Sequence, residues 1–198
     1  MTDLYETALG VQQLCEQQGW PFSIIGGIAV QRWGEIRFTQ DVDLILFTGL
    51  GGEQPFIDFL LKHYRLRAPC SPKTALANRV LLLANYLGVS IDVAFGAIDF
   101  ERRSIERSSL WELPEGVALR TCSAEDLLVH KCFANRDQDW VDVDGILVRQ
   151  KDKLDLELVR RELKPLVDLK EDPQIIKRFE ERITRNSQPF TRIHTEEP

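Results

Sequence analysis

Residues 24–47 read IIGGIAVQRWGEIRFTQDVDLILF. The pattern predicts an apolar strand that ends in Gly26-Gly27, then a short helix, then a second strand over 42–47. Glycines let a backbone approach a phosphate closely, and the helix that follows offers free N–H groups and a positive dipole. A Gly-Gly pair alone more often marks a plain turn, so its weight here comes from the order of these elements.

Two aspartates occupy the start of the second strand. Strand residues alternate between faces, so Asp41 and Asp43 share one face while Val42 and Leu44 take the other. Two neighbouring carboxylates repel each other, and a divalent cation such as Mg²⁺ is the obvious compensation. The pair alone leaves open a plainer interpretation, in which both acids sit at an exposed strand end.

A third acid, Asp92, favours the metal site over the exposed strand end. The stretch over 89–95, VSIDVAF, places Asp92 among β-branched residues in the middle of a strand, where an unpartnered carboxylate is rare. If this strand lies beside 42–47, three carboxylates converge. Such a set holds two metals about 3.5–4 Å apart in phosphoryl and nucleotidyl transfer.

The remainder of the chain changes character near Arg120. The expected helices span 4–18, 28–33 and 53–63, and the expected strands span 22–25, 42–47, 79–85, 89–95 and 117–122, with 79–85 and 89–95 forming a hairpin. From Ser123 onward nearly everything is predicted helical, with Pro165 and Pro173 interrupting the later helices and a loose tail after Ser187. We therefore predict an α+β (α/β) fold: a small mixed sheet flanked by helices over 1–120, then a helical subdomain over 121–198.

Composition limits the classes of function. The chain has 198 residues, 43% hydrophobic and 28% charged, with a formal net charge of −6. A uniformly basic nucleic-acid surface is excluded, although a local basic cleft is not. No stretch approaches the length of a membrane helix and no signal peptide is evident, so we expect a cytoplasmic protein without membrane contact. Four scattered cysteines are expected to be reduced thiols: Cys15, Cys70, Cys122 and Cys132.

These motifs together resemble a known superfamily. Gly-Gly, Asp-x-Asp and a third acid on a later strand are similar to the nucleotidyltransferase fold of the DNA polymerase β superfamily. Residues 24–47, together with KCFANRDQDWVDVDGILVRQ over 131–150, resemble the nucleotidyltransferases grouped with AbiEii/AbiGii-type toxins of type IV toxin–antitoxin systems. The resemblance covers about 24–150.

The resemblance implies roles for individual residues. Asp41, Asp43 and Asp92 would bind Mg²⁺ or Mn²⁺, and Asp92 would also take the proton of the attacking hydroxyl. The residues implied to bind the NTP are Gly26, Gly27, Arg37, Thr39, Lys131 and Arg136. Asp139 and Asp142 complete a second motif of the Lys…Arg…Asp-x-x-Asp kind. From the residues alone, this second group is equally well explained as a solvated helix face with surface ion pairs.

The predicted function is metal-dependent transfer of a nucleoside monophosphate from an NTP to a hydroxyl of an RNA, a protein or a small molecule. The resemblance adds a toxin role and a cognate antitoxin. Two alternatives stay open. One is a nucleotide-binding or partner-binding regulatory protein without turnover, and the other is a phosphohydrolase that uses the same metals.

Overall fold

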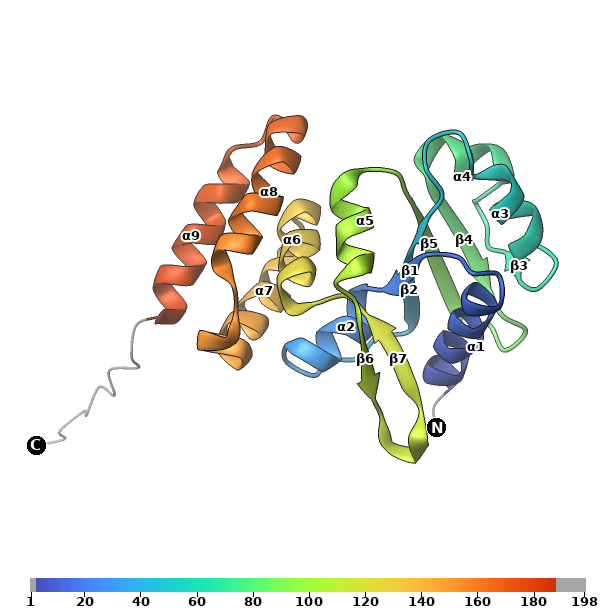
Figure 1. The fold of residues 1–198 in the computed structure, drawn as a ribbon, viewed down its shortest axis with the longest axis horizontal. Helices are drawn as coiled ribbons and strands as arrows, with labels where there is room; N and C mark the ends of the chain where they lie inside the picture. The colour runs from blue at the N-terminus through green and yellow to red at the C-terminus, as the bar shows by residue number, and fades with distance from the viewer. Residues whose placement is uncertain (1–2, 188–198) are drawn as a thin grey trace, which may run out of the picture.

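A seven-stranded mixed sheet organises the protein in the computed structural model, which describes residues 3–187 (Figure 1). The strands are β1 (Phe22–Ile24), β2 (Asp41–Phe47), β3 (Arg65–Leu66), β4 (Val80–Ala84), β5 (Ser90–Gly96), β6 (Ser109–Glu112) and β7 (Ala118–Thr121). Their order is β3-β4-β5-β2-β1-β7-β6. The expected tail after Ser187 lies outside the described residues.

The centre of the sheet carries the acidic strands. β2 pairs in parallel with β5 and antiparallel with β1, and β4 and β5 form the predicted antiparallel hairpin. In β2, Val42 and Leu44 are buried while Asp41 and Asp43 remain partly accessible, as period-two alternation requires. The face that carries the acids is therefore not covered by the main core.

Helices lie on both sides of this sheet. They are α1 (Asp3–Gln17), α2 (Gly26–Trp33), α3 (Gln54–Leu60), α4 (Pro72–Asn78), α5 (Asp99–Glu106), α6 (Ala124–Ala134), α7 (Asp137–Gln150), α8 (Leu156–Lys170) and α9 (Gln174–Ser187). Figure 1 shows α1, α3 and α4 on one side, and α2 and α5 between the sheet and the α6–α9 bundle. Within 3–187, no helix combines the length and apolar character that crossing a membrane requires.

Two hydrophobic clusters stabilise this arrangement. One joins the sheet to α1, α3 and α4, with Leu46 and Val93 fully buried in it. The other fills the α6–α9 bundle around Trp140, and it also contains Ala29 of α2 and Phe100 of α5. Because α2 and α5 belong to the second cluster, the helical bundle packs directly on the sheet's own helices.

Ion pairs between partly exposed arginines and buried carboxylates reinforce that contact. Arg103 Nη2 of α5 lies 2.7 Å from the Glu162 carboxylate of α8, and Arg107 Nη2 lies 2.6 Å from the Asp126 carboxylate of α6. Asp126 also belongs to the predicted helix start, where its backbone N–H donates to Ser123 Oγ at 3.1 Å. The division at 120/121 stays a prediction, while these contacts fix the α6–α8 segment to α5.

The C-terminal end of α2 is held from two directions. Arg32 donates to the Ser109 carbonyl of β6 at 2.9 Å. On the opposite side, Arg149 donates to the Gly34 carbonyl at 2.5 Å and Gln150 to the Trp33 carbonyl at 2.6 Å, both from α7. The helix that follows the glycine pair is thus joined to both the sheet and the bundle.

The structure differs from the expected elements in several places, and α5 is a further helix that was not expected. β3, α4 and β6 were not expected, because β3 has two residues, α4 has seven and β6 is an exposed edge strand without an alternating apolar face. The helix expected over 53–63 ends at Leu60. Pro165 lies inside α8, so the expected interruption there was wrong. Its neighbours Leu163 and Leu166 are buried, and this packing keeps the helix continuous.

Candidate active site

The three predicted strand acids lie on one face of the sheet. β2 and β5 are parallel neighbours, with Asp43 directly opposite Asp92 and Asp41 opposite Ser90. Because strand side chains alternate, Asp41, Asp43 and Asp92 emerge on the same side. The sequence left the pairing of these two strands open, and the structure brings them together.

Gly26 and Gly27 lie very close to the acidic face of the sheet, and only residues without a side chain fit there. Gly26 has a φ of +61°, in the left-handed region, and a Cβ there would collide with the Asp43 carboxylate. A Cβ at Gly27 would collide with Thr39 Oγ1. The Gly27 backbone N–H hydrogen-bonds to the Asp43 carboxylate. The start of α2, Thr39 and Asp43 therefore form one closely packed unit.

Asp43 lacks enough positive charge to balance it. Burial raises the pKa of Asp43 to about 6, and the charges of Asp92 and Asp41 add to the rise. The Gly27 N–H and the Lys131 ammonium oppose it without cancelling it. Carboxylates crowded in this way are stabilised by a bound cation, so the donor set fits a divalent metal.

Asp92 has a partner that sequence reasoning missed. Arg67, which directly follows β3, forms an ion pair with the Asp92 carboxylate through Nη2. Burial still leaves the pKa of Asp92 above its ordinary value. Arg67 Nε is buried without a hydrogen-bond partner among the described residues. No pattern marks Arg67, because β3 is too short to show alternation.

The side chains themselves do not form a finished metal cage. Among residues 3–187, no three His, Cys, Asp or Glu side chains are placed so that they could hold one ion. Two of the strand acids have other partners: Arg67 forms an ion pair with Asp92, and the Gly27 N–H binds Asp43. A cation bound by Asp92 would therefore compete with the Arg67 guanidinium for this carboxylate.

The second predicted group forms a buried ionic network beside these acids. Lys131 Nζ of α6 lies 3.1 Å from Asp139 Oδ1 and 2.8 Å from Asp142 Oδ2, both on α7. Arg136 Nε contacts Asp139 Oδ2 at 2.6 Å, and Arg37 donates two bonds to Asp142 at 2.7 and 3.0 Å. The interpretation of Asp139 and Asp142 as salt-bridge partners is confirmed, whereas a solvated face is wrong for Lys131, which is buried.

Lys131 of this network lowers the pKa of Asp43 as well as the pKa values of Asp139 and Asp142. Burial alone would raise the pKa values of Asp139 and Asp142, but hydrogen bonds and charges from Arg136, Arg37 and Lys131 hold both below the ordinary value. Asp43 lies within electrostatic range of all three cations. The Arg136 side chain is 75% exposed, so its guanidinium is open to a bound anion.

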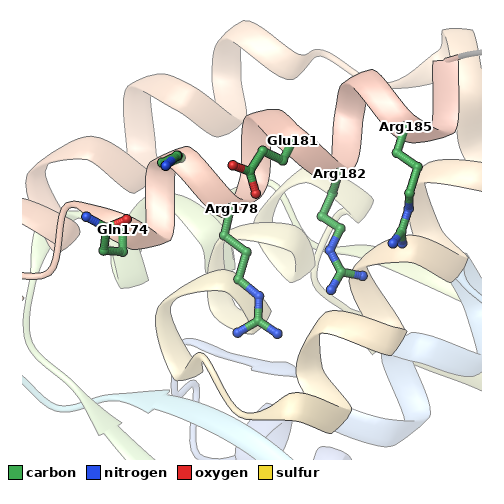
Figure 2. A pocket seen from close by; sticks show the side chains of 6 residues that line it. Gln174, Arg178, Glu181, Arg182 and Arg185 are labelled. Atoms are coloured by element: carbon green, nitrogen blue, oxygen red, sulfur yellow. The ribbon is translucent and has the colours of Figure 1, made fainter.

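A separate basic cavity of about 510 Å³ lies along α9 (Figure 2). Figure 2 shows Arg178, Arg182 and Arg185 pointing from α9 toward α7. There Arg178 stacks on Trp140 at 4.6 Å and Arg185 pairs with Asp144 at 2.5 Å. These contacts identify the arginines as packing groups that hold α9 against α7.

Solved structures share this architecture. An antigenic nucleotidyltransferase-like protein from Paracoccidioides brasiliensis matches with a TM-score of 0.50 and 14% identity, over 90% of this chain and 92% of that one. The antibiotic-resistance factor ANT(2'')-Ia matches with a TM-score of 0.52 and 16% identity, over 84% of this chain and 91% of that one. The chain has the nucleotidyltransferase fold.

This likeness reaches no further than the fold, because both identities are low. No protein-family model matches the chain, and no curated protein matches it in sequence. The AbiEii/AbiGii-type resemblance therefore stays a prediction, as do the roles of the individual site residues.

Proposed function

We propose that the protein is a Mg²⁺-dependent nucleotidyltransferase that transfers a nucleoside monophosphate from an NTP to a hydroxyl group. The observation that carries the proposal is the position of Asp43, opposite Asp92 on neighbouring strands and directly beneath Gly26-Gly27. Carboxylates for metals and a glycine turn for phosphates meet there at one point.

The chain's own groups have distinct tasks in this proposal. Asp41, Asp43 and Asp92 hold two divalent cations, Mg²⁺ or Mn²⁺. When bound, such cations neutralise charge on the phosphates and favour ionisation of the attacking hydroxyl. The N–H groups at the start of α2 bind the triphosphate, and Arg136 and Lys131 face it from the helical side. Because Arg37 is fixed by Asp142, it orients the loop that carries Thr39.

The reaction is an in-line displacement at the α-phosphorus. The acceptor oxygen forms the new P–O bond, the bond from the α-phosphorus to the bridging oxygen breaks, and pyrophosphate leaves. Asp92 takes the proton of the attacking hydroxyl, a role that suits a carboxylate whose pKa is raised. Catalysis in such a site depends on positioning and electrostatic stabilisation rather than on a covalent intermediate.

The acceptor classes proposed from the sequence are an RNA, a protein side chain and a small molecule, with a toxin role and an antitoxin partner resting on the resemblance alone. The principal alternative is a nucleotide-binding regulatory protein with the same fold. The complete set of strand acids opposes it, since a site without turnover does not need three crowded carboxylates at a cost to stability.

The test uses each α-labelled NTP with Mg²⁺ and total cellular RNA, protein and small molecules. We expect labelled product and pyrophosphate from the wild type, and a loss of at least about 10³-fold for Asp43→Asn, because a metal ligand is removed. Asp58→Asn, an exposed aspartate on α3, serves as the matched control. Equal transfer by Asp43→Asn would refute the proposal, and release of phosphate instead of pyrophosphate would indicate a phosphohydrolase.

A further inference from the structure

The loop over 35–40 joins α2 to β2 and carries residues on which the proposed function depends. Arg37 and Thr39 belong to it, and Asp41 follows it directly. The loop has no regular secondary structure, and its Phe38 side chain is 79% exposed. Because apolar burial contributes little here, the position of the loop depends on its polar contacts.

Gln31 of α2 makes the contact that fixes the backbone of this loop. Its Nε2 donates to the Arg37 carbonyl at 3.2 Å. This is the one hydrogen bond by which a described residue outside the loop reaches the backbone of 35–40. The Arg37 guanidinium is bound separately, by Asp142 at 2.7 and 3.0 Å. Gln31 therefore positions the main chain of the loop, and Asp142 positions one of its side chains.

Tyr5 of α1 determines which way the Gln31 amide points. Its hydroxyl donates to Gln31 Oε1, so the amide nitrogen is left to face the Arg37 carbonyl. The Tyr5 ring meets that of Trp111 in β6 edge to face, with the centroids 6.4 Å apart. A chain of two hydrogen bonds thus connects a fixed tyrosine to the loop that enters β2.

Both members of this pair line a cleft of about 660 Å³ beside Asp41. The first turn of α1, the loop before β2 and the turn before β5 form its walls. Water in the cleft can replace a hydrogen bond that the pair loses. Removing the Tyr5 hydroxyl should therefore cost little stability, although it frees the Gln31 amide to rotate away from the loop.

We propose that Tyr5 and Gln31 are positioning residues of the active site, which act on nucleotidyl transfer through the backbone of the loop over 35–40. This inference rests on the proposed function. Thr39 of the loop lies against Gly27, where the triphosphate is proposed to bind, so a shift of the loop is transmitted to the phosphates. A misplacement of about 1 Å in an active site can cost about 10²-fold in rate.

The first measurement is the rate of nucleotidyl transfer by variants of the full chain. Gln31→Met keeps the length of the side chain but removes its donor and its acceptor. We expect kcat to fall about ten- to hundred-fold, while the KM for the Mg²⁺–NTP complex changes less than about two-fold. Tyr5→Phe should lower kcat about three- to ten-fold. It should have no further effect in the Gln31→Met background, because the amide that it orients is gone.

The second measurement follows the loop directly, without nucleotide. Chymotrypsin cleaves after aromatic residues, and Phe38 presents such a site on the loop. Cleavage at Phe38 should be about five- to ten-fold faster in Gln31→Met, because the loop opens more often once the bond to the Arg37 carbonyl is lost. The melting temperatures of Tyr5→Phe and Gln31→Met should stay within about 4 °C of the wild type.

Two matched variants serve as controls. Gln12 also has an amide with two bonds, donating to the Ala118 carbonyl at 3.1 Å and accepting from the Arg120 N–H at 2.8 Å. Because this amide is buried and joins α1 to β7, Gln12→Met should lower the melting temperature yet retain the wild-type kcat and cleavage at Phe38. Tyr64→Phe removes a hydroxyl that hydrogen-bonds to no other described residue, and it should match the wild type in kcat and cleavage.

A kcat of Gln31→Met equal to that of the wild type or of Gln12→Met would overturn this inference. Rate losses of Tyr5→Phe and Gln31→Met that multiply in the double variant would also overturn it, since independent effects add as free energies. Unchanged cleavage at Phe38 in Gln31→Met would show that the pair does not fix the loop, with nucleotidyl transfer itself intact. If the wild type transferred no nucleotide, the proposed function would fail and the catalytic part of this inference with it.

Discussion

The strand aspartates and the α7 aspartates lie around one site in opposite electrostatic conditions. Burial and mutual repulsion raise the pKa of Asp43, whereas three cations hold the pKa values of Asp139 and Asp142 below normal. At neutral pH, Asp43 destabilises the metal-free protein, whereas Asp139 and Asp142 stabilise it. Chemistry is thus expected from the carboxylates whose raised pKa shows a shortage of positive charge, and architecture from those that nearby cations keep ionised.

The largest expected effect on stability comes from the paired acids. Asp142→Ala would leave Lys131 and Arg37 without one of their partners, and breaking a buried ion pair costs about 3–5 kcal/mol of unfolding free energy. Urea denaturation measures this loss. Asp168→Ala removes an exposed aspartate paired with Lys164 and should cost less than about 1 kcal/mol. Equal effects for the two variants would remove the distinction between the two sets of acids.

Replacing Asp43, in contrast, should raise the free energy of unfolding. In metal-free buffer at pH 7.5, we expect Asp43→Asn to be more stable than the wild type by up to about 3 kcal/mol, which is the linkage value of a pKa raised from near 4 to about 6. Between these values the unfolded carboxylate ionises first, so wild-type stability falls as pH rises. The gain should therefore be complete above pH 6 and absent below pH 4. A gain that does not depend on pH would contradict this assignment.

Mg²⁺ should offset the lower stability that the wild type has relative to Asp43→Asn in metal-free buffer. At ten times its dissociation constant, the ion should stabilise the wild type by about 1.4 kcal/mol at pH 7.5. The stabilisation should shrink at pH 5.5, where Asp43 is largely protonated, and EDTA should abolish it. Thermal unfolding with and without Mg²⁺ measures the effect. Full stabilisation of Asp43→Asn by Mg²⁺ would place the ion elsewhere.

Arg67 provides the finest test, because it gives one strand acid a partner. Arg67→Ala should raise the apparent Mg²⁺ affinity two- to five-fold, since the cation no longer competes with a guanidinium worth about 0.5–1 kcal/mol. Thermal shift titrations with Mg²⁺ report this change. Arg65→Ala, in which the lost contact is to the Asn85 carbonyl, is the control and should leave the affinity unchanged.

Much of the sheet and of its acidic face was predictable from the sequence, because the alternation of apolar and polar residues and the position of glycines are local signals. The strand over 42–47 and the hairpin after 79 follow from period-two patterns, and the shared face of Asp41 and Asp43 follows directly. The pairing of Asp43 with Asp92 could only be conditional, because strand order depends on contacts between distant segments.

Other parts had no local signal. The partner of Asp92, Arg67, comes from a two-residue strand whose position is set by pairing with β4. The sequence could not show that Lys131 is buried between Asp139 and Asp142, because helical spacing predicts a surface pair equally well. The cleft beside Asp41 combines three segments that meet only after folding.

Hydrogen bonds join α2 to both the sheet and the helical bundle, and they limit how a substrate can reach the site. Its N-terminal end carries the glycine pair, while its C-terminal end is bonded to β6 on one side and to α7 on the other. Swinging the bundle away from the sheet would break one of these two sets of bonds, whichever side α2 followed. A substrate therefore gains access by side-chain rearrangements, such as release of Asp92 by Arg67, which occur faster than hinge motions of whole domains. Binding kinetics should accordingly show no slow step from domain opening.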